Sequence, residues 1–151
     1  MNKMNASMKI ISLLLLSLLF WGNYVNGQNL QNAFDKIADI EGFERVDYTA
    51  EEYGYPKEIG SMKMVGYGNA DPRDKVLVIL SKIPSKLLVA EENIRGEMCR
   101  WYIEDLKNGS TVMMCIFVGT GSADTVAQLF TGSSRTYYHK FAKKIEEEFK
   151  K

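Results

Sequence analysis

The sequence contains few of the residues that mark several common protein classes. It has two cysteines, three prolines and one histidine in 151 residues. Two cysteines exclude a disulfide-dense scaffold, and a single histidine excludes a histidine-rich metal site. Nineteen basic and nineteen acidic residues give a formal net charge of +0, which argues against nucleic-acid binding because that needs a surplus of Lys and Arg. The 46% hydrophobic content is typical of a globular domain.

The first 27 residues predict a signal peptide rather than part of the fold. Two lysines precede an apolar stretch, 10–21, and Val25 and Gly27 fit the small-residue subsites of a signal peptidase. We therefore expect cleavage before Gln28. A membrane anchor is the alternative, but a run of 12 residues falls short of the ~20 that a spanning helix needs.

Residues 28–151 predict one exported domain, either periplasmic or secreted. Without the two lysines of the leader, 17 basic residues stand against 19 acidic ones. A domain of ~124 residues buries about two-thirds of its unfolded surface, so it needs no metal or disulfide for stability. We expect no transmembrane segment in this mature chain, because no part of it has a long enough apolar run.

Hydrophobic periodicity predicts an α+β domain. The expected order is α-β-β-α-β-β-β-β-α, with a mainly antiparallel sheet in two layers and the helices packed on one face. Residues 124–131 are expected to form the last strand, although a short helix is an alternative. Helices are expected from Asn29, over 72–82 and from Ser133 or Ser134, and the other strands at 43–50, 61–67, 86–91, 98–106 and 111–118.

Three residues give start signals for these helices. Asn29 is a possible N-cap of the first helix. Asp71 and Pro72 precede the second helix, where an acidic cap and a first-turn proline are typical.

Asn108 and Gly109 predict a β-hairpin, because an Asn-Gly pair between two apolar runs is the strongest short hairpin signal. If Asn108 and Gly109 are the only two loop residues, each residue of one strand lies opposite the residue of the other strand for which the two numbers sum to 217. Trp101 then lies opposite Ile116. In this register Cys99 lies on the core face and Cys115 on the opposite face. We therefore expect no disulfide, because a bridge needs facing Cβ atoms.

The outer face of the same sheet is the candidate binding surface. The predicted register places Arg100, Tyr102 and Phe117 there, and aromatic and arginine residues are enriched at binding hot spots. Met113 and Cys115 are weak candidates for a soft-metal site, such as one for copper(I). Because methionine is also a common core filler, no metal or other cofactor is predicted.

The sequence offers no recognisable catalytic motif. Ser122, Asp124 and His139 include the residue types of a hydrolase triad, but nothing places them together and no GxSxG element is present. The Gly119–Ser122 loop lacks the lysine of a phosphate-binding loop. His139 is expected at an exposed or boundary position of the last helix.

Two short motifs resemble the opening of a small exported domain-of-unknown-function family of Bacteroidota. They are residues 34–38 (FDKIA) and 41–46 (EGFERV), followed later by the sequence LFTG at 129–132. The resemblance covers most of residues 28–132. It implies an exported bacterial α+β domain acting at the cell envelope, without catalytic residues that could be carried over.

We therefore expect a non-catalytic binding or envelope-associated domain whose partner is a protein or an envelope component. A small exported hydrolase that uses Asp or Glu is one alternative, and it requires a concave pocket with convergent polar side chains. A soft-metal binder that uses Met and Cys is the other.

Overall fold

The computed structural model of the protein describes residues 28–49, 51–67, 72–94, 96–119, 125–132 and 134–149. The expected signal peptide, residues 1–27, lies outside these described residues, as do Asp71, Ser122 and Asp124.

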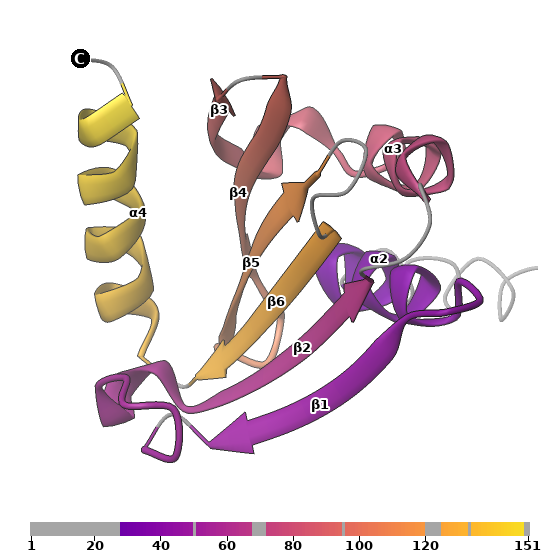
Figure 1. The fold of residues 1–151 in the computed structure, drawn as a ribbon. Helices are drawn as coiled ribbons and strands as arrows, with labels where there is room; N and C mark the ends of the chain where they lie inside the picture. The colour runs from indigo at the N-terminus through magenta and orange to yellow at the C-terminus, as the bar shows by residue number, and fades with distance from the viewer. Residues whose placement is uncertain are drawn as a thin grey trace, which may run out of the picture.

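Six antiparallel strands form one sheet in the order β1-β2-β6-β5-β4-β3, so β1 and β3 are its edges (Figure 1). The mixed α+β class is confirmed. The last strand covers Thr125–Gly132, so the helical alternative for this segment is wrong. The strands are β1 (Glu44–Thr49), β2 (Ser61–Tyr67), β3 (Leu88–Ile94), β4 (Glu97–Asp105), β5 (Thr111–Val118) and β6 (Thr125–Gly132).

Helices cover both faces of this sheet. Helices α2 (Asn29–Ala38) and α3 (Arg73–Ser81) lie on one face, and α4 (Arg135–Phe149) lies on the other (Figure 1). The expectation that all helices pack on one face is therefore wrong for α4. The reason is that both faces of β4 and β5 carry large apolar side chains, and burying each set requires a helix packed on that face. Two short 3₁₀ helices, η1 (Lys57–Ile59) and η2 (Ser85–Leu87), precede β2 and β3.

The two faces carry two separate hydrophobic cores. Even-numbered residues of β4 and β5 point towards α2 and α3, and odd-numbered residues point towards α4, because side chains alternate along a strand. In the first core, α2 contributes three side chains with no exposed surface, Leu30, Phe34 and Ile37. The second core is smaller and contains Ile59, Met62, Met113, Phe130 and Tyr138.

The β4–β5 hairpin has a register one residue away from the expected one. Trp101 lies opposite Cys115, not Ile116. The connection is a three-residue loop: the Leu106 N–H donates to the Ser110 carbonyl over 2.9 Å, and the Gly109 N–H donates to the Leu106 carbonyl over 3.1 Å. Gly109 has φ 87°, the left-handed conformation in which this kind of loop places glycine. The extra loop residue changes every cross-strand partner.

Helix α2 is capped by a side chain from the sheet. Its N-cap residue is Gln28, which makes no side-chain capping bond, and Asn29 is already helical, so the expected cap is wrong. The Glu104 carboxylate instead accepts the backbone N–H groups of Asn29, over 3.1 Å, and Leu30, over 2.9 Å. A carboxylate at this end also interacts favourably with the helix dipole. This contact fixes the start of α2 above β4.

The start of α4 is held at the end of β6. The Ser134 hydroxyl accepts the Tyr137 N–H over 3.3 Å, as expected for a capping serine. The hydroxyl of the fully buried Tyr138 donates to the Ile59 carbonyl, which joins α4 to η1. Gly132 makes this junction possible, because a Cβ there would lie 2.7 Å from the Tyr138 hydroxyl oxygen.

Replacing Glu104 should destabilise the fold. The Glu104 residue is 5% exposed, so Glu104→Ala leaves the buried Leu30 N–H and the partly buried Asn29 N–H without their acceptor. We expect the free energy of unfolding to fall by about 2–3 kcal/mol in urea denaturation, since each such donor costs about 1–3 kcal/mol. Glu104→Gln, which keeps one acceptor oxygen, should lose less. The exposed Glu51→Ala is the matched control, and an equal loss in both alanine variants would contradict the capping role.

Candidate functional site

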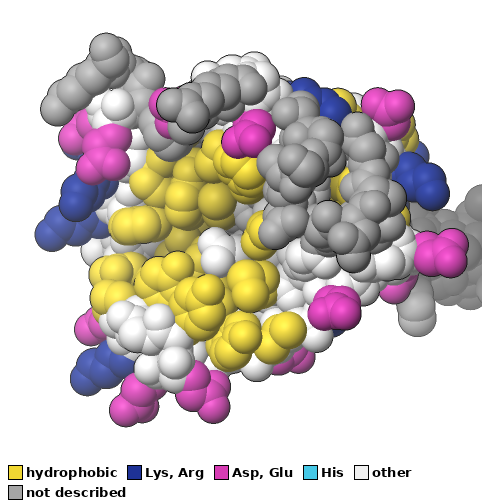
Figure 2. All heavy atoms as spheres, in the orientation of Figure 1, with side chains coloured by type: hydrophobic (Ala, Val, Ile, Leu, Met, Phe, Trp, Pro, Cys, Tyr) yellow, Lys and Arg dark blue, Asp and Glu magenta, His cyan; other side chains and the backbone are white. Residues whose placement is uncertain are grey.

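The face of the sheet under α4 is only partly covered by that helix. Helix α4 contacts β3, β4 and β5, but the central part of this face extends beyond it to β6 and β2. We define the apolar floor as five residues there, all half-buried: Met64, Cys115, Phe117, Val126 and Gln128. Figure 2 shows hydrophobic side chains gathered in a hollow between α4 and the β1–β2 side of the molecule. This hollow is the candidate site.

Strand pairing places the floor residues in cross-strand rows. Met64 lies opposite Gln128, which lies opposite Cys115, which in turn lies opposite Trp101. This row crosses four strands, and a neighbouring row contains Val126 and Phe117. With strands about 4.8 Å apart, the row from β2 to β4 is about 14 Å long. The floor is therefore long enough for a small extended ligand.

Aromatic rings flank the hollow on its β1–β2 side. Tyr53 stacks on Tyr55 with ring centroids 5.5 Å apart, and Tyr48 lies 5.0 Å from Tyr53. Tyr55 in turn meets the buried Phe130 edge-on at 5.7 Å. The tyrosines therefore form an apolar wall that continues into the smaller core.

A second aromatic group lines the side formed by α4. Tyr137 and Phe141 stack with an interplanar angle of 5°, and Phe141 meets Trp101 edge-on at 6.0 Å. These rings are half-buried and pack against the same core as the tyrosine wall. Large rigid rings on two sides provide contact area for a ligand at a low cost in side-chain entropy.

Gln128 is the polar residue of the apolar floor. Its amide nitrogen donates to the Met64 sulfur over 3.8 Å, and its side chain is hydrogen bonded to Tyr55. Burial raises the pKa of the Tyr55 hydroxyl, followed by the effect of neighbouring Tyr53, so this hydroxyl is neutral at physiological pH. The floor residues carry no charge, and one amide among apolar side chains is typical of a site that orients an uncharged ligand.

The structure brings the two cysteines together. Cys99 and Cys115 are both half-buried on the α4 face, where each thiol affects the pKa of the other through hydrogen bonding. The bond from Cys115 lowers the pKa of Cys99 against the opposing effects of burial and of the Glu92 charge. The pKa of Cys115 is strongly raised by the bond to Cys99 and by burial. The expectation that these cysteines lie on opposite faces is wrong, because the hairpin register differs by one residue.

The expected binding surface is not assembled. Arg100 and Tyr102 lie on the α2–α3 face, where Tyr102 is 3% exposed and belongs to the larger core. Arg100 pairs with Glu91 of β3. Phe117 lies on the opposite face, in the apolar floor. The three were grouped by an incorrect register, and recognition of the three-residue loop would have separated them.

The two weak soft-metal candidates differ in exposure. Met113 and Cys115 share a face, but Met113 is 2% exposed and packs in the smaller core. Within the described ranges, no group of three or more His, Cys, Asp or Glu residues could hold a metal ion. Cys115 has Cys99, not Met113, as its sulfur neighbour.

An open cavity of about 420 Å³ lies where β5 starts and β6 ends, and none of the floor residues lines it. Gln28 and Gln31 line it together with Thr111 and Thr131. Its described lining contains no Asp, Glu, His or Cys, so it does not provide the acid and base that the hydrolase alternative requires.

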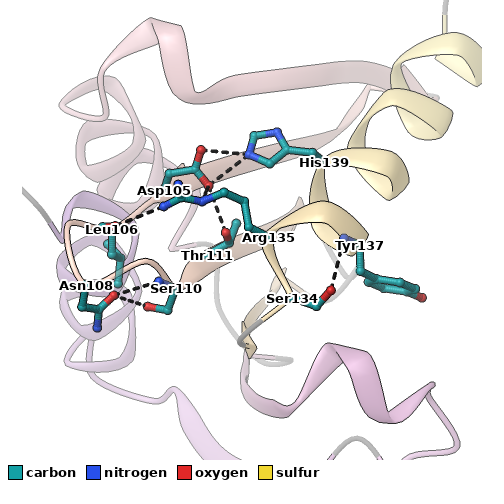
Figure 3. A network of polar contacts seen from close by, with 9 residues as sticks. All are labelled: Asp105, Leu106, Asn108, Ser110, Thr111, Ser134, Arg135, Tyr137 and His139. Atoms are coloured by element: carbon teal, nitrogen blue, oxygen red, sulfur yellow. Dashed lines mark hydrogen bonds and ion pairs between the residues drawn. The ribbon is translucent and has the colours of Figure 1, made fainter.

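His139 lies in a cluster of polar contacts around Asp105 (Figure 3). The other two residue types considered for a hydrolase triad, Ser122 and Asp124, lie outside the described residues. The His139 Nε2 lies 2.8 Å from Asp105 Oδ2, and Asp105 Oδ1 accepts a hydrogen bond from Thr111 Oγ1 over 2.9 Å. Arg135 Nε forms an ion pair with the same Asp105 oxygen at 3.1 Å. Side chains from both ends of the hairpin loop and from α4 therefore meet at one carboxylate. This cluster fixes the start of α4 against β4.

Comparison with known proteins returned no matching family model, no matching curated protein and no matching solved structure. The resemblance to the exported family of Bacteroidota therefore stays a prediction. Among the residues that the structure describes, no helix is long and apolar enough to span a membrane.

Replacing Asp105 should weaken the attachment of α4 in a pH-dependent way. Burial raises the pKa of Asp105, but the hydrogen bonds from His139 and Thr111 and the Arg135 charge outweigh it, so the folded-state pKa is lowered. A lowered carboxyl pKa contributes stability above the unfolded-state value of about 3.9, and this contribution is lost as pH falls through the folded-state pKa. Asp105→Asn should therefore lose about 0.5–1.5 kcal/mol at pH 7 and nothing at strongly acidic pH.

Urea denaturation at a series of pH values measures this difference. The exposed Asp39→Asn is the control and should change little at any pH. A pH-independent loss in Asp105→Asn would show that the carboxylate charge does not hold α4.

Proposed function

We propose that the protein is a non-catalytic binding domain that takes a hydrocarbon chain of a lipid-like ligand on the apolar floor. The observation that supports this most is an uncharged, half-buried sheet face with aromatic residues on two sides, left open by α4 (Figure 2). Exposed apolar surface of this kind marks ligand or partner sites in folded proteins.

The backbone of the floor favours a hydrocarbon over a peptide. The strands β2, β6 and β5 that form the floor are paired with neighbours on both sides. Their N–H and C=O groups are thus used in the sheet, and few polar side chains are present on this face. A peptide would bring its own amide groups, and an apolar floor would leave them without partners at a cost of several kcal/mol. A hydrocarbon chain brings no such groups.

The edge strand β1 does not offer an easy alternative for peptide addition. Its sequence alternates charged residues with Val46 and Tyr48, and five of its six residues are exposed. Charged side chains on an edge strand are a common way to prevent pairing with another chain.

Gln128 gives the proposed ligand one polar anchor. An alcohol, ester or amide group near the middle of the floor could hydrogen bond to its side chain, while the hydrocarbon covers Met64, Val126 and Phe117. Each CH₂ group removed from water contributes about 0.8 kcal/mol. Affinity should therefore depend mainly on chain length.

Displacement of the uncharged fluorescent probe N-phenyl-1-naphthylamine by n-alcohols tests this function. We expect the affinity to rise about fourfold per added carbon from octanol to dodecanol, in line with about 0.8 kcal/mol per CH₂. Met64→Glu should weaken binding at least about tenfold, because the ligand would then bury a charge. Gln128→Leu should weaken alcohol binding by about fivefold, because the hydroxyl loses its hydrogen-bond partner, and it should keep the dependence on chain length.

The control is Val78→Glu, which places the same charge on α3, at an apolar side chain that is 56% exposed on the other side of the sheet. It should leave binding unchanged. Absence of chain-length dependence, or equal binding by Met64→Glu and Val78→Glu, would refute the proposal. Far-UV circular dichroism of each variant confirms that the fold is retained.

We also propose that the protein is exported, with residues 1–27 removed, and that its lipid-like ligand is a component of the bacterial envelope. This proposal rests on the order of charged, apolar and small residues in the leader. The export part of the proposal is independent of the chemistry of the hollow, whereas the envelope ligand rests on the proposed hydrocarbon binding.

Mass spectrometry of the protein recovered from the periplasm of a Gram-negative host tests export. The expected product begins at Gln28. A Gly27→Trp variant should keep the leader, because signal peptidase requires a small residue at that subsite. Recovery of the original full-length chain in the cytoplasm alone would contradict the proposal.

A further inference from the structure

We infer that Cys99 and Cys115 form a two-sulfur site for a soft monovalent d¹⁰ cation, copper(I) being the physiological example. This site does not depend on the proposed hydrocarbon ligand. It replaces the Met113–Cys115 pairing considered from the sequence, because Met113 is buried in the smaller core.

The strand register places the two sulfurs at a diagonal position. Cys99 lies directly opposite Phe117, and Cys115 lies directly opposite Trp101, so the cysteines are diagonal neighbours on one face of β4 and β5. Each thiol also affects the pKa of the other, as expected for close neighbours. The strand register therefore presents both sulfurs on one face of β4 and β5.

The diagonal position suits a bridging ion better than a disulfide. Diagonal neighbours in an antiparallel pair are about 7–8 Å apart, whereas the Cα atoms of a disulfide are usually about 4.4–6.8 Å apart. A metal ion bonded to both sulfurs spans a wider gap than a direct sulfur–sulfur bond. Both cysteines are free in the structure.

The ligands around this pair favour a soft ion of low coordination number. Thiolates bind both Cu(I) and zinc well, but structural zinc sites use four ligands. Glu92, opposite Cys99, is the acidic neighbour of the pair, and no described group of three or more His, Cys, Asp or Glu could hold a metal ion. A dithiol with apolar neighbours therefore lacks the ligands that zinc or a hard cation needs.

Binding is an exchange of protons for the cation and involves no redox step. Cu(I) forms one bond to each sulfur, and each thiol releases its proton to solvent. The product, one Cu⁺ with two thiolates, carries one negative charge. Cys99 is half-buried, so solvent still reaches the site and screens that charge. Phe117 and Trp101, the cross-strand partners of the cysteines, restrict water on either side.

Trp101 provides a direct spectroscopic readout, because it lies opposite Cys115. Reduced protein, desalted under nitrogen, is titrated with Ag(I) as an air-stable probe while tryptophan fluorescence and native mass spectra are recorded. We expect one equivalent to bind and to quench the fluorescence. Cu(I) affinity is then measured by competition with bathocuproine disulfonate.

The variants decide which sulfurs bind. Cys99→Ser and Cys115→Ser should each weaken Cu(I) binding at least about 100-fold, because each removes a direct metal ligand. Removing a residue that only orients a ligand typically weakens metal binding by about 10–100-fold. Met113→Leu, the matched control for a buried sulfur nearby, should bind as the original protein does. Circular dichroism verifies that each variant is folded.

Either of two results would overturn the inference. One is absence of Ag(I) and Cu(I) binding by the reduced protein. The other is unchanged affinity in the Cys99→Ser/Cys115→Ser double variant, which would place the ion elsewhere.

Discussion

The loop between β4 and β5 sets the pattern of the whole sheet. Its hydrogen bonds, from Leu106 to Ser110 and from Gly109 to Leu106, enclose three residues instead of two. The positive φ of Gly109 makes this loop possible without strain. Because the side-chain period of a strand is two, this loop length decides which residues of the two strands share a face. The cysteine pair and both cores follow from that decision.

The second determining feature is how the helices are attached to the sheet. Helix α2 is capped by Glu104, and the start of α4 is fixed by Asp105. Glu104 and Asp105 are neighbours at the end of β4, and their side chains point to opposite faces of the sheet. One strand end therefore positions a helix on each side of the sheet. Helix α4 continues over β3 and β4, and the apolar floor on β2, β5 and β6 is left beside it (Figure 1).

Local sequence patterns predicted much of the fold. The strands expected at 43–50 and 61–67 correspond to β1 and β2, since strand alternation depends only on neighbouring residues. Ser134 was recognised as a capping residue because its partner, Tyr137, lies within the same turn. The candidate site was predicted less well. Phe117 and Cys115 were identified, but Arg100 and Tyr102 belong to the other face, and the tyrosine wall and the Cys99–Cys115 contact were missed.

The sequence by itself determined the α+β class, the approximate strands and the position of the hairpin, because these depend on short-range periodicity and turn chemistry. The tertiary structure alone decided the hairpin register, the capping of Asn29 and Leu30 by Glu104 across 74–75 residues of chain, and the packing of α4 on the second face. These features arise from contacts between residues far apart in the chain. A pattern within one segment carries no information about which distant segment will meet it.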